Sequence, residues 1–220
     1  SVGFGGECDE KYSVNEQKEY THIQCKDFSV QTGMPGTYNA ENALLAAYLL
    51  RAAGFIENKY IFGMNGIPGR LEKVTAQGMT VYIDYAHSPD SLEKVLALLH
   101  TRKTHRLLTV FGCTGDRDRT KRPVMAQIAE RYSDYVVITS DDPHSEDPEA
   151  ICREVEQGMT GSHYVVEPDR KKAITEALAY AQQGDIVLIA GKGHETVQIF
   201  DGYEIPFNDR EVVEAFFAAH

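Results

Sequence analysis

The stretch Val81-Tyr82-Ile83-Asp84-Tyr85-Ala86-His87-Ser88-Pro89 decides how most of this chain folds. Its first four residues predict a short strand. Ser88 followed by Pro89 is typical of a helix start, because the hydroxyl can cap the helix and the proline ring is preset for its first turn. The same alternation continues downstream, with strands predicted over 107–111, 135–139, Tyr164–Val166 and Ile186–Ala190, and helices over 89–99, 123–132, 148–158 and 170–182. This pattern indicates an α/β fold with a Rossmann-like, mostly parallel sheet and flanking helices.

The two ends of the chain depart from this alternation. Asp201-Gly202 lies between two short β-type runs, 196–200 and 203–205, which predicts a C-terminal β-hairpin, and a short helix is predicted from Asp209. Near the other end, alternating residues 22–30 predict a half-buried strand and the apolar run 42–50 a helix that ends before Gly54. A segment rich in Gly, Pro and Asn over 63–69 is interpreted as a linker. We therefore expect two parts, 1–66 and 67–220.

Composition excludes several classes of function. The 220 residues carry a formal net charge of −11, and such an acidic protein repels the phosphate backbone of nucleic acids. No run of eighteen apolar residues exists, so no membrane span is expected. The four cysteines are scattered without the spacing of zinc ligands, which favours a reducing cytoplasm and predicts no metal site. The chain begins at Ser1 and not at a methionine, which suggests a fragment or a processed product.

Reactive residue types gather just after four of the predicted strands. These segments are Asp84-Tyr85-Ala86-His87, Gly112-Cys113-Thr114-Gly115-Asp116-Arg117-Asp118-Arg119, Ser140-Asp141-Asp142-Pro143-His144 and Gly191-Lys192-Gly193-His194-Glu195. Taken singly, each can be an ordinary turn or cap, and Arg117 and Arg119 can form solvated salt bridges. Open parallel sheets bind ligands at the carboxyl ends of their strands, however. The four segments together predict a site at that edge.

Two phosphate-binding motifs are absent from these segments. Gly191-Lys192 resembles the end of a Walker loop, but Ile186 stands where the first glycine is needed and Gly193 replaces the Ser or Thr that holds magnesium. The third glycine of a dinucleotide fingerprint is also missing. Neither motif supports nucleotide binding by itself.

The chain resembles the Mur ligases, and within them the enzymes that add the third amino acid to UDP-N-acetylmuramoyl-L-alanyl-D-glutamate. The resemblance runs from about residue 33 to the end. It rests on the segments after the strands, on Asn39-Ala40-Glu41-Asn42-Ala43-Leu44, on Pro68-Gly69-Arg70-Leu71-Glu72 and on Thr120-Lys121-Arg122-Pro123. It implies that residues 1–66 are the end of a central ATPase domain and 67–220 a C-terminal, amino-acid-binding domain of dinucleotide-binding-like topology. The family's phosphate loop and magnesium ligands lie upstream and have no counterpart here.

The resemblance implies an ATP-dependent ligase of peptidoglycan precursor synthesis. ATP, with Mg²⁺, phosphorylates the carboxylate of the UDP-N-acetylmuramoyl-dipeptide, and the amine of a diamino acid attacks the acyl phosphate. Such catalysis is mostly positioning and charge neutralisation. This chain alone is expected to be inactive, with no catalytic residue assigned to it.

Site residues follow from the matching motifs. Asn42 would face adenine, Arg70 would lie beside the interdomain hinge, and Asp84 and His87 would lie on the ATP side. The incoming amino acid would bind at Arg117, Asp141, Asp142, His144, Gly191 and Glu195. Arg117 would grip its carboxylate with a bidentate fork, and Glu195 would take an ammonium group.

The identity of the added amino acid is left open between L-lysine and meso-2,6-diaminopimelate. Diaminopimelate-adding members carry Asp-Asn-Pro-Arg where this chain has Asp141-Asp142-Pro143-His144. The missing guanidinium and the added carboxylate suit an ammonium better than a carboxylate, which favours L-lysine slightly.

Three rival hypotheses remain, and the main one comes from another class. The first is a non-catalytic Rossmann-like module that binds an amino acid or nucleotide. The second is a related ligase making cyanophycin or polyglutamyl folate, which the segments 115–123 and 191–195 disfavour. The third is a flavodoxin-like regulator, which Asp141 could mimic but which leaves Arg117 and Glu195 unexplained.

Overall fold

The computed structural model describes residues 12–16, 21–55, 60–64 and 66–219. The chain divides into two compact units, Ser1–Ile67 and Pro68–His220. Each unit has its own sheet, with its own helical cover. No helix in the described ranges is long and apolar enough to cross a membrane.

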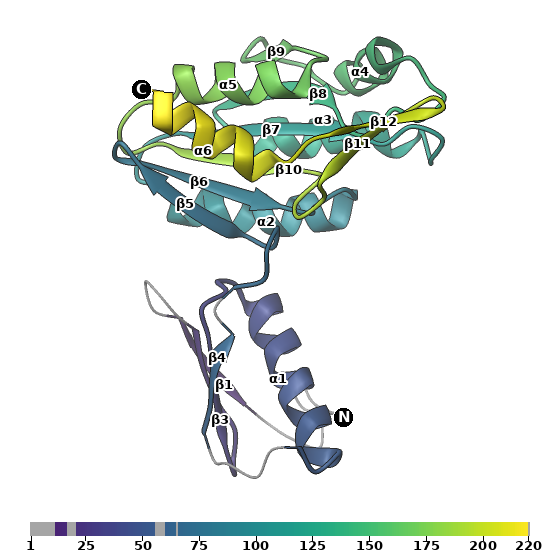
Figure 1. The fold of residues 1–220 in the computed structure, drawn as a ribbon. Helices are drawn as coiled ribbons and strands as arrows, with labels where there is room; N and C mark the ends of the chain where they lie inside the picture. Colours follow the sequence, from purple (N-terminus) through teal and green to yellow (C-terminus); the bar gives the residue numbers. More distant parts are fainter. Residues whose placement is uncertain (1–11, 17–20, 56–59, 65, 220) are drawn as a thin grey trace. The chain divides into compact units, whose positions relative to one another are not determined.

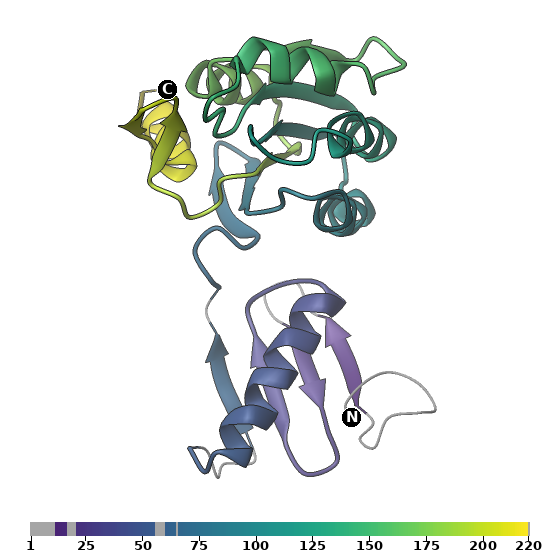
Figure 2. The ribbon, with the colours of Figure 1, turned by 90° about the vertical axis from the view of Figure 1, so that its right-hand side faces the viewer.

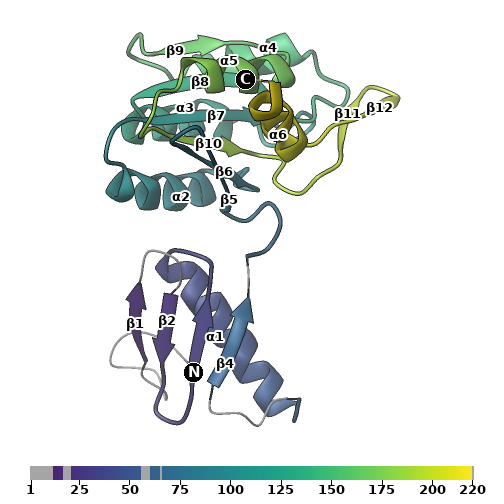
Figure 3. The same ribbon diagram turned by 60° about the vertical axis from the view of Figure 1, so that its left-hand side comes forward.

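The first unit is a four-stranded sheet covered by one helix (Figure 3). Its elements are β1 (Ser13–Glu16), β2 (Thr21–Gln24), β3 (Ser29–Thr32), α1 (Thr37–Ala52) and β4 (Tyr60–Met64). The strands lie in the order β1-β2-β3-β4; β3 and β4 are parallel, with α1 as their connection, and the other pairs are antiparallel. Small residues of α1, Ala40, Ala43 and Ala47, pack with Ile23 and Val30 in a buried core. The alternation of small apolar residues lets the helix lie close to the sheet.

Two predictions in this unit were wrong in detail. Residues 22–30 form two strands and not one, because the chain turns at Lys26 and Asp27, where Cys25 N donates to Phe28 O at 2.9 Å. Both turn residues are exposed, which suits their charge. The segment interpreted as a linker over 63–69 begins too early, since Gly63 and Met64 complete β4.

The second unit confirms the α/β prediction. Its six-stranded sheet has the order β5-β6-β10-β7-β8-β9, in which β6, β10, β7, β8 and β9 are parallel and β5 runs antiparallel to β6 (Figure 1). The strands are β5 (Glu72–Ala76), β6 (Met79–Asp84), β7 (Leu107–Cys113), β8 (Tyr135–Ser140), β9 (Tyr164–Val166) and β10 (Ile186–Ala190). The sequence reading missed β5. It is joined to β6 by Gln77-Gly78, both with positive φ, which is the geometry of a tight hairpin turn.

Helices cover both faces of this sheet. They are α2 (Pro89–Arg102), α3 (Lys121–Tyr132), α4 (Pro148–Glu156), α5 (Arg170–Tyr180) and α6 (Asp209–Ala219). Residues of α5 and α6 pack on one face, with Ile174 and Val213 against Val110 and Ile189. Figure 2 shows α2 and α3 on the side of the sheet opposite α6. The predicted cap is present, since Ser88 Oγ accepts a hydrogen bond from Ser91 N.

The predicted C-terminal hairpin is also present. β11 (Val197–Phe200) and β12 (Tyr203–Pro206) pair antiparallel around Asp201-Gly202. The hairpin is attached to the loop after β8, because His144 N donates to Ile199 O at 3.1 Å. The described cysteines, Cys25, Cys113 and Cys152, are buried free thiols; Cys8 lies outside the described residues.

Candidate functional site

The loops that follow β6, β7, β8 and β10 meet at one edge of the second unit's sheet. β10 pairs with both β6 and β7, and β7 pairs with β8, so the four strands are consecutive neighbours and their carboxyl ends are adjacent. A cavity of about 570 Å³ lies there. It is lined by Tyr85, His87, Ser88, Thr114, Arg117, Asp118, Lys121, Asp141, Asp142, His144, Gly191, Glu195 and Ile199. All six residues predicted to bind the amino acid are therefore brought together, along with His87.

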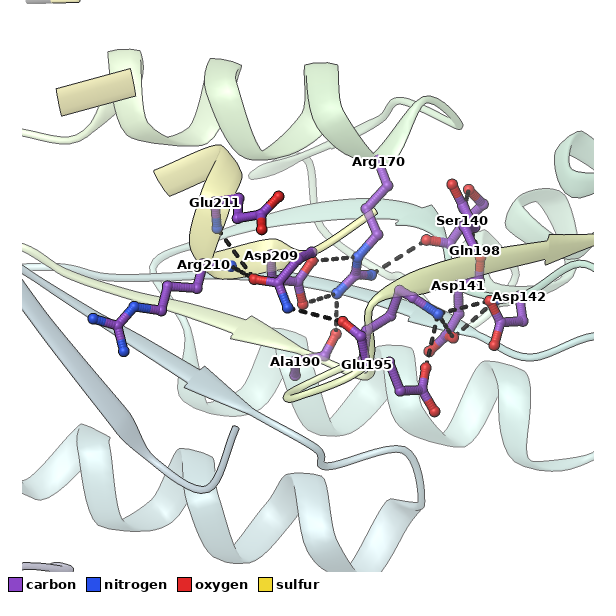
Figure 4. Close-up of polar contacts among 12 residues, drawn as sticks. Ser140, Asp141, Asp142, Arg170, Ala190, Glu195, Gln198, Asp209, Arg210 and Glu211 are labelled. Carbon is purple, nitrogen blue, oxygen red and sulfur yellow. Dashed lines mark hydrogen bonds and ion pairs between the residues drawn. The ribbon is translucent and has the colours of Figure 1, made fainter. Parts of the chain in front are cut away.

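A buried ammonium group joins the carboxylates on one wall of this cavity. Lys192 is fully buried, and its Nζ lies 2.7 Å from Asp142 Oδ1, 2.8 Å from Glu195 Oε2 and 4.0 Å from Asp141 Oδ1. Figure 4 shows Asp141, Asp142 and Glu195 converging on this point. Burial alone would lower the pKa of Lys192, but its hydrogen bonds to Asp142 and Glu195 outweigh burial and raise that pKa. Lys192 is therefore charged. It was not predicted as a site residue, because in the sequence it was compared only with the lysine of a Walker loop.

The same three carboxylates could be mistaken for a metal site. One oxygen from each lies within 4.8 Å of the others, a spacing that a cation could bridge. Lys192 Nζ already stands among them and forms short ion pairs with Asp142 and Glu195. A divalent ion would have to displace a fully buried lysine, so this cluster does not fit the Mg²⁺ that the sequence resemblance implies. The ammonium is the resident cation.

A second buried cation supports the floor of the cavity. The Arg170 guanidinium forms a two-pronged ion pair with Asp209, with both N–O distances 2.8 Å, and neither side chain is exposed (Figure 4). It also donates to Ser140 O and Ala190 O, the last residues of β8 and β10. Burial raises the pKa of Asp141 beside it, although Arg170 and Lys192 both oppose that rise. Arg170 thus fixes the two strand ends from which the acidic wall begins.

Gly191 is needed for this close packing. Its φ is +121°, and a Cβ added there would lie 2.5 Å from Asp141 Oδ2. Any side chain would push Asp141 away from the β10 end. This steric requirement explains why a glycine occupies position 191, which was predicted to line the cavity.

A third buried cation holds the loop that carries Arg117. Arg122 is fully buried and binds Glu146 through two nitrogens at 2.9 and 2.7 Å. Glu146 in turn accepts a hydrogen bond from Asp116 N at 2.7 Å, directly before Arg117. These hydrogen bonds, led by Arg122, hold the pKa of Glu146 at about 2. Arg117 itself is exposed in the cavity and has no ion-pair partner among the described residues.

Of the residues predicted to contact ATP in the second unit, His87 lines the cavity, whereas Arg70 and Asp84 do not. Asp84 is buried; its Oδ2 accepts a hydrogen bond from Leu71 N at 2.7 Å, and burial raises its pKa. It therefore holds the segment before β5 and does not line the cavity. Arg70 is exposed and its guanidinium lies 4.9 Å from the centre of the Tyr85 ring. Asn42 is exposed on α1 of the first unit.

The second unit, which carries this cavity, also contains the region that matches a known family. The model of the Mur ligase glutamate ligase domain matches residues 69–193, more than half of the chain. The chain belongs to the Mur ligase family. It is 46% identical over 193 residues to the UDP-N-acetylmuramoyl-L-alanyl-D-glutamate–2,6-diaminopimelate ligase of Geobacillus thermodenitrificans, covering 85% of this chain and 40% of that protein. It is 44% identical over 223 residues to the enzyme of the same name from Chlamydia muridarum, covering 92% and 46%.

Solved structures agree with this assignment. A structure of a UDP-N-acetylmuramoyl-L-alanyl-D-glutamate–2,6-diaminopimelate ligase matches 98% of this chain and 46% of its own, with a TM-score of 0.69 and 33% identity. The MurF ligase of Thermotoga maritima in complex with ADP matches with a TM-score of 0.65 at 15% identity, which shows the fold alone. This Mur ligase chain spans about 40% of the length of the first curated relatives it matches.

The structure corrects one sequence-based argument about the choice between L-lysine and meso-2,6-diaminopimelate. The extra carboxylate of Asp142 was expected to favour an ammonium group on the substrate. Asp142 Oδ1 instead accepts hydrogen bonds from Lys192 Nζ at 2.7 Å and from Ile199 N at 2.9 Å, and the residue is nearly buried. The negative charge of Asp142 is therefore compensated by donors within the protein. His144 is half-buried and does line the cavity, with a positive φ of 50°.

Proposed function

We propose that the protein carrying this chain is an ATP-dependent ligase that adds a diamino acid to UDP-N-acetylmuramoyl-L-alanyl-D-glutamate in the cytoplasm. The cavity at the carboxyl edge of the second unit's sheet is proposed to receive the incoming diamino acid. One observation carries this proposal: an unpaired guanidinium, Arg117, and a half-buried carboxylate, Glu195, line the same cavity. That pairing is complementary to a zwitterion, because the two ends of an amino acid carry opposite charges.

The chemistry assigned to this chain is positioning. Arg117 would hold a carboxylate of the diamino acid through its planar fork, as guanidinium groups do. Glu195 would accept hydrogen bonds from one ammonium group, and the other amine would attack the acyl phosphate of the peptide. Holding the amine close to the reacting carbon supplies most of the rate that an enzyme of this kind needs. ATP and Mg²⁺ are proposed to be bound by parts of the protein that this chain does not contain.

The diamino acid is proposed to be meso-2,6-diaminopimelate. Curated relatives at 38–49% identity are named for that substrate. The carboxylate of Asp142, which favoured L-lysine in the sequence, is neutralised by Lys192. Only His144 remains as an argument for L-lysine.

The test uses the full-length protein with ATP, Mg²⁺ and UDP-N-acetylmuramoyl-L-alanyl-D-glutamate, with mass spectrometry of the UDP-linked product. We expect a tripeptide product with meso-2,6-diaminopimelate and less with L-lysine. A preference for L-lysine would refute the choice of substrate. Absence of product with either diamino acid, together with glutamate addition to a folate substrate, would refute the assignment to peptidoglycan precursor synthesis in favour of the related folate ligase. The 220 residues alone should bind the diamino acid and hydrolyse no ATP.

A further inference from the structure

Lys192 stands out because a fully buried ammonium is costly unless its partners offset the loss of water. Its two short ion pairs come from different places in the chain. Asp142 belongs to the loop after β8, and Glu195 to the loop after β10, so the lysine joins two loops that are fifty residues apart. Both of these partners line the cavity proposed to bind the diamino acid.

The charges around Lys192 do not balance. Among the described residues, the cations that form ion pairs with Asp141, Asp142, Glu195 and Asp209 in this cluster are Lys192 and Arg170. Arg170 is fully engaged by Asp209 and by two backbone carbonyls. Lys192 is therefore the cation that pairs with the three carboxylates Asp141, Asp142 and Glu195. The cluster as a whole keeps an excess of negative charge. An ammonium group entering the cavity would reduce that excess.

Glu195 is the member of this cluster that can meet a ligand. Its side chain is 30% exposed, whereas Asp141 and Asp142 are nearly buried. It is held by Lys192, whose Nζ donates to Oε2 at 2.8 Å. A glutamate with three rotatable bonds would otherwise sample several positions. The ion pair with Lys192 favours one orientation of the carboxylate at the cavity wall.

We propose that Lys192 is a positioning residue for the diamino acid: its ammonium holds Glu195 in the orientation that receives the substrate's second amino group. This inference rests on the proposed function of the cavity. It goes further by assigning selectivity for a second amino group to the pair Lys192–Glu195 and not to Glu195 alone.

The first test measures diamino-acid binding to the chain by isothermal titration calorimetry, with Lys192→Met as the variant. Methionine has similar length and no charge, so it removes the two ion pairs and leaves the volume nearly filled. We expect affinity for meso-2,6-diaminopimelate to fall about 30-fold, a loss of the size measured when one partner of a buried charge pair is removed. Lys94→Met is the matched control, because Lys94 is an exposed lysine of α2 that pairs only with Asp90; its affinity should equal that of the wild type.

A double-mutant cycle separates positioning from a structural role. Glu195→Gln should weaken binding by a similar factor, and Lys192→Met combined with Glu195→Gln should be little weaker than either single variant, because both break one interaction. Additive losses would overturn the inference. Equal binding by the wild type and Lys192→Met would also overturn it.

A second double variant guards against loss of folding. Lys192→Met with Asp142→Asn removes a cation and a carboxylate together, so the thermal midpoint should return toward that of the wild type. The positioning role requires affinity to stay low in this folded variant, because Glu195 still lacks its donor. Recovery of both stability and affinity would show that Lys192 only neutralises Asp142, and would refute the proposal.

The failure of this inference can be told from the failure of the proposed function. If the wild-type chain binds no diamino acid, the function assigned to the cavity and the role of Lys192 fall together. If the wild type binds and Lys192→Met binds equally well, only the role of Lys192 falls. In the full-length enzyme the same variant should raise KM for the diamino acid and leave KM for ATP unchanged.

Discussion

Gly69 allows a test of how tightly the segment before β5 is built into the cavity loops. Its φ is +68°, and a Cβ placed on it would overlap His194 N and the carbonyl carbon of Gly193, and lie 2.8 Å from Gly193 Cα. All of these are backbone atoms, which cannot rotate aside. Gly202, in the turn between β11 and β12, provides the control, because its φ is +73° and a Cβ there meets nothing within 4 Å.

The two alanine variants share one cost and differ in another. Left-handed backbone costs an alanine about 1–2 kcal/mol relative to glycine, and this applies to Gly69→Ala and Gly202→Ala alike. Only Gly69→Ala must also move backbone, and overpacking of this kind costs roughly 1–3 kcal/mol. We therefore expect Gly69→Ala to lower the free energy of unfolding by about 1–3 kcal/mol more than Gly202→Ala does.

Urea denaturation of the second unit measures this difference directly. The backbone that must move lies at Gly193 and His194, immediately before Glu195, so Gly69→Ala should also weaken diamino-acid binding while Gly202→Ala leaves it unchanged. Equal losses of stability in Gly69→Ala and Gly202→Ala would show that the backbone around Gly69 can shift to accept a side chain without added strain. The inferred rigidity of the loop that carries Glu195 would then be wrong.

Three further predictions concern the charged groups. Arg117→Lys keeps the charge but loses the bidentate fork, so affinity for the diamino acid should fall roughly ten-fold in calorimetry, while stability stays within about 0.5 kcal/mol of the wild type. Arg122 holds the pKa of the Glu146 carboxylate at about 2. The stabilising effect of this carboxylate is therefore present above the ordinary glutamate pKa and is lost as the pH falls toward 2. Between about pH 4.5 and 2, the free energy of unfolding of Glu146→Gln should fall less steeply than that of the wild type. Arg170→Met leaves Asp209 buried without its partner and should destabilise the chain by about 3–5 kcal/mol in urea, and Arg170→Met with Asp209→Leu should recover most of that loss.

Local signals were enough to predict most of the second unit. Residues 81–89 carry a buried strand, a turn and a capped helix start in one stretch, and each of these depends on neighbours in the sequence. The strand β5 was not predicted, because the alternation of apolar and polar residues in Glu72–Ala76 is weak and one face of the strand is polar and exposed. Its pairing with β6 is set by the turn at Gln77-Gly78, and this turn was not predicted from the sequence.

The site was predictable only in part, for a related reason. Strand ends can be predicted from a sequence, and the residues that follow them place Arg117, Asp141 and Glu195 at one edge of the sheet. The partners of buried cations cannot be read in this way, because Lys192 and Asp142 are fifty residues apart and meet only through the strand order β10-β7-β8. Asp142 was for this reason interpreted as a free carboxylate. The charge of a pocket depends on such pairs as much as on its lining residues.

Three of the largest fully buried side chains in the described structure are cations, Arg122, Arg170 and Lys192. Buried ion pairs contribute little net stability, because removing both charges from water costs nearly as much as their attraction returns. Their placement is informative all the same, since each fixes a loop or strand end at the cavity: Arg122 the loop before Arg117, Arg170 the ends of β8 and β10, and Lys192 the carboxylate of Glu195. A ligand that enters loops already fixed in this way loses little of its binding free energy to ordering them. The buried cations are therefore best explained by pre-organisation of the cavity for a charged substrate, and not by stability of the fold.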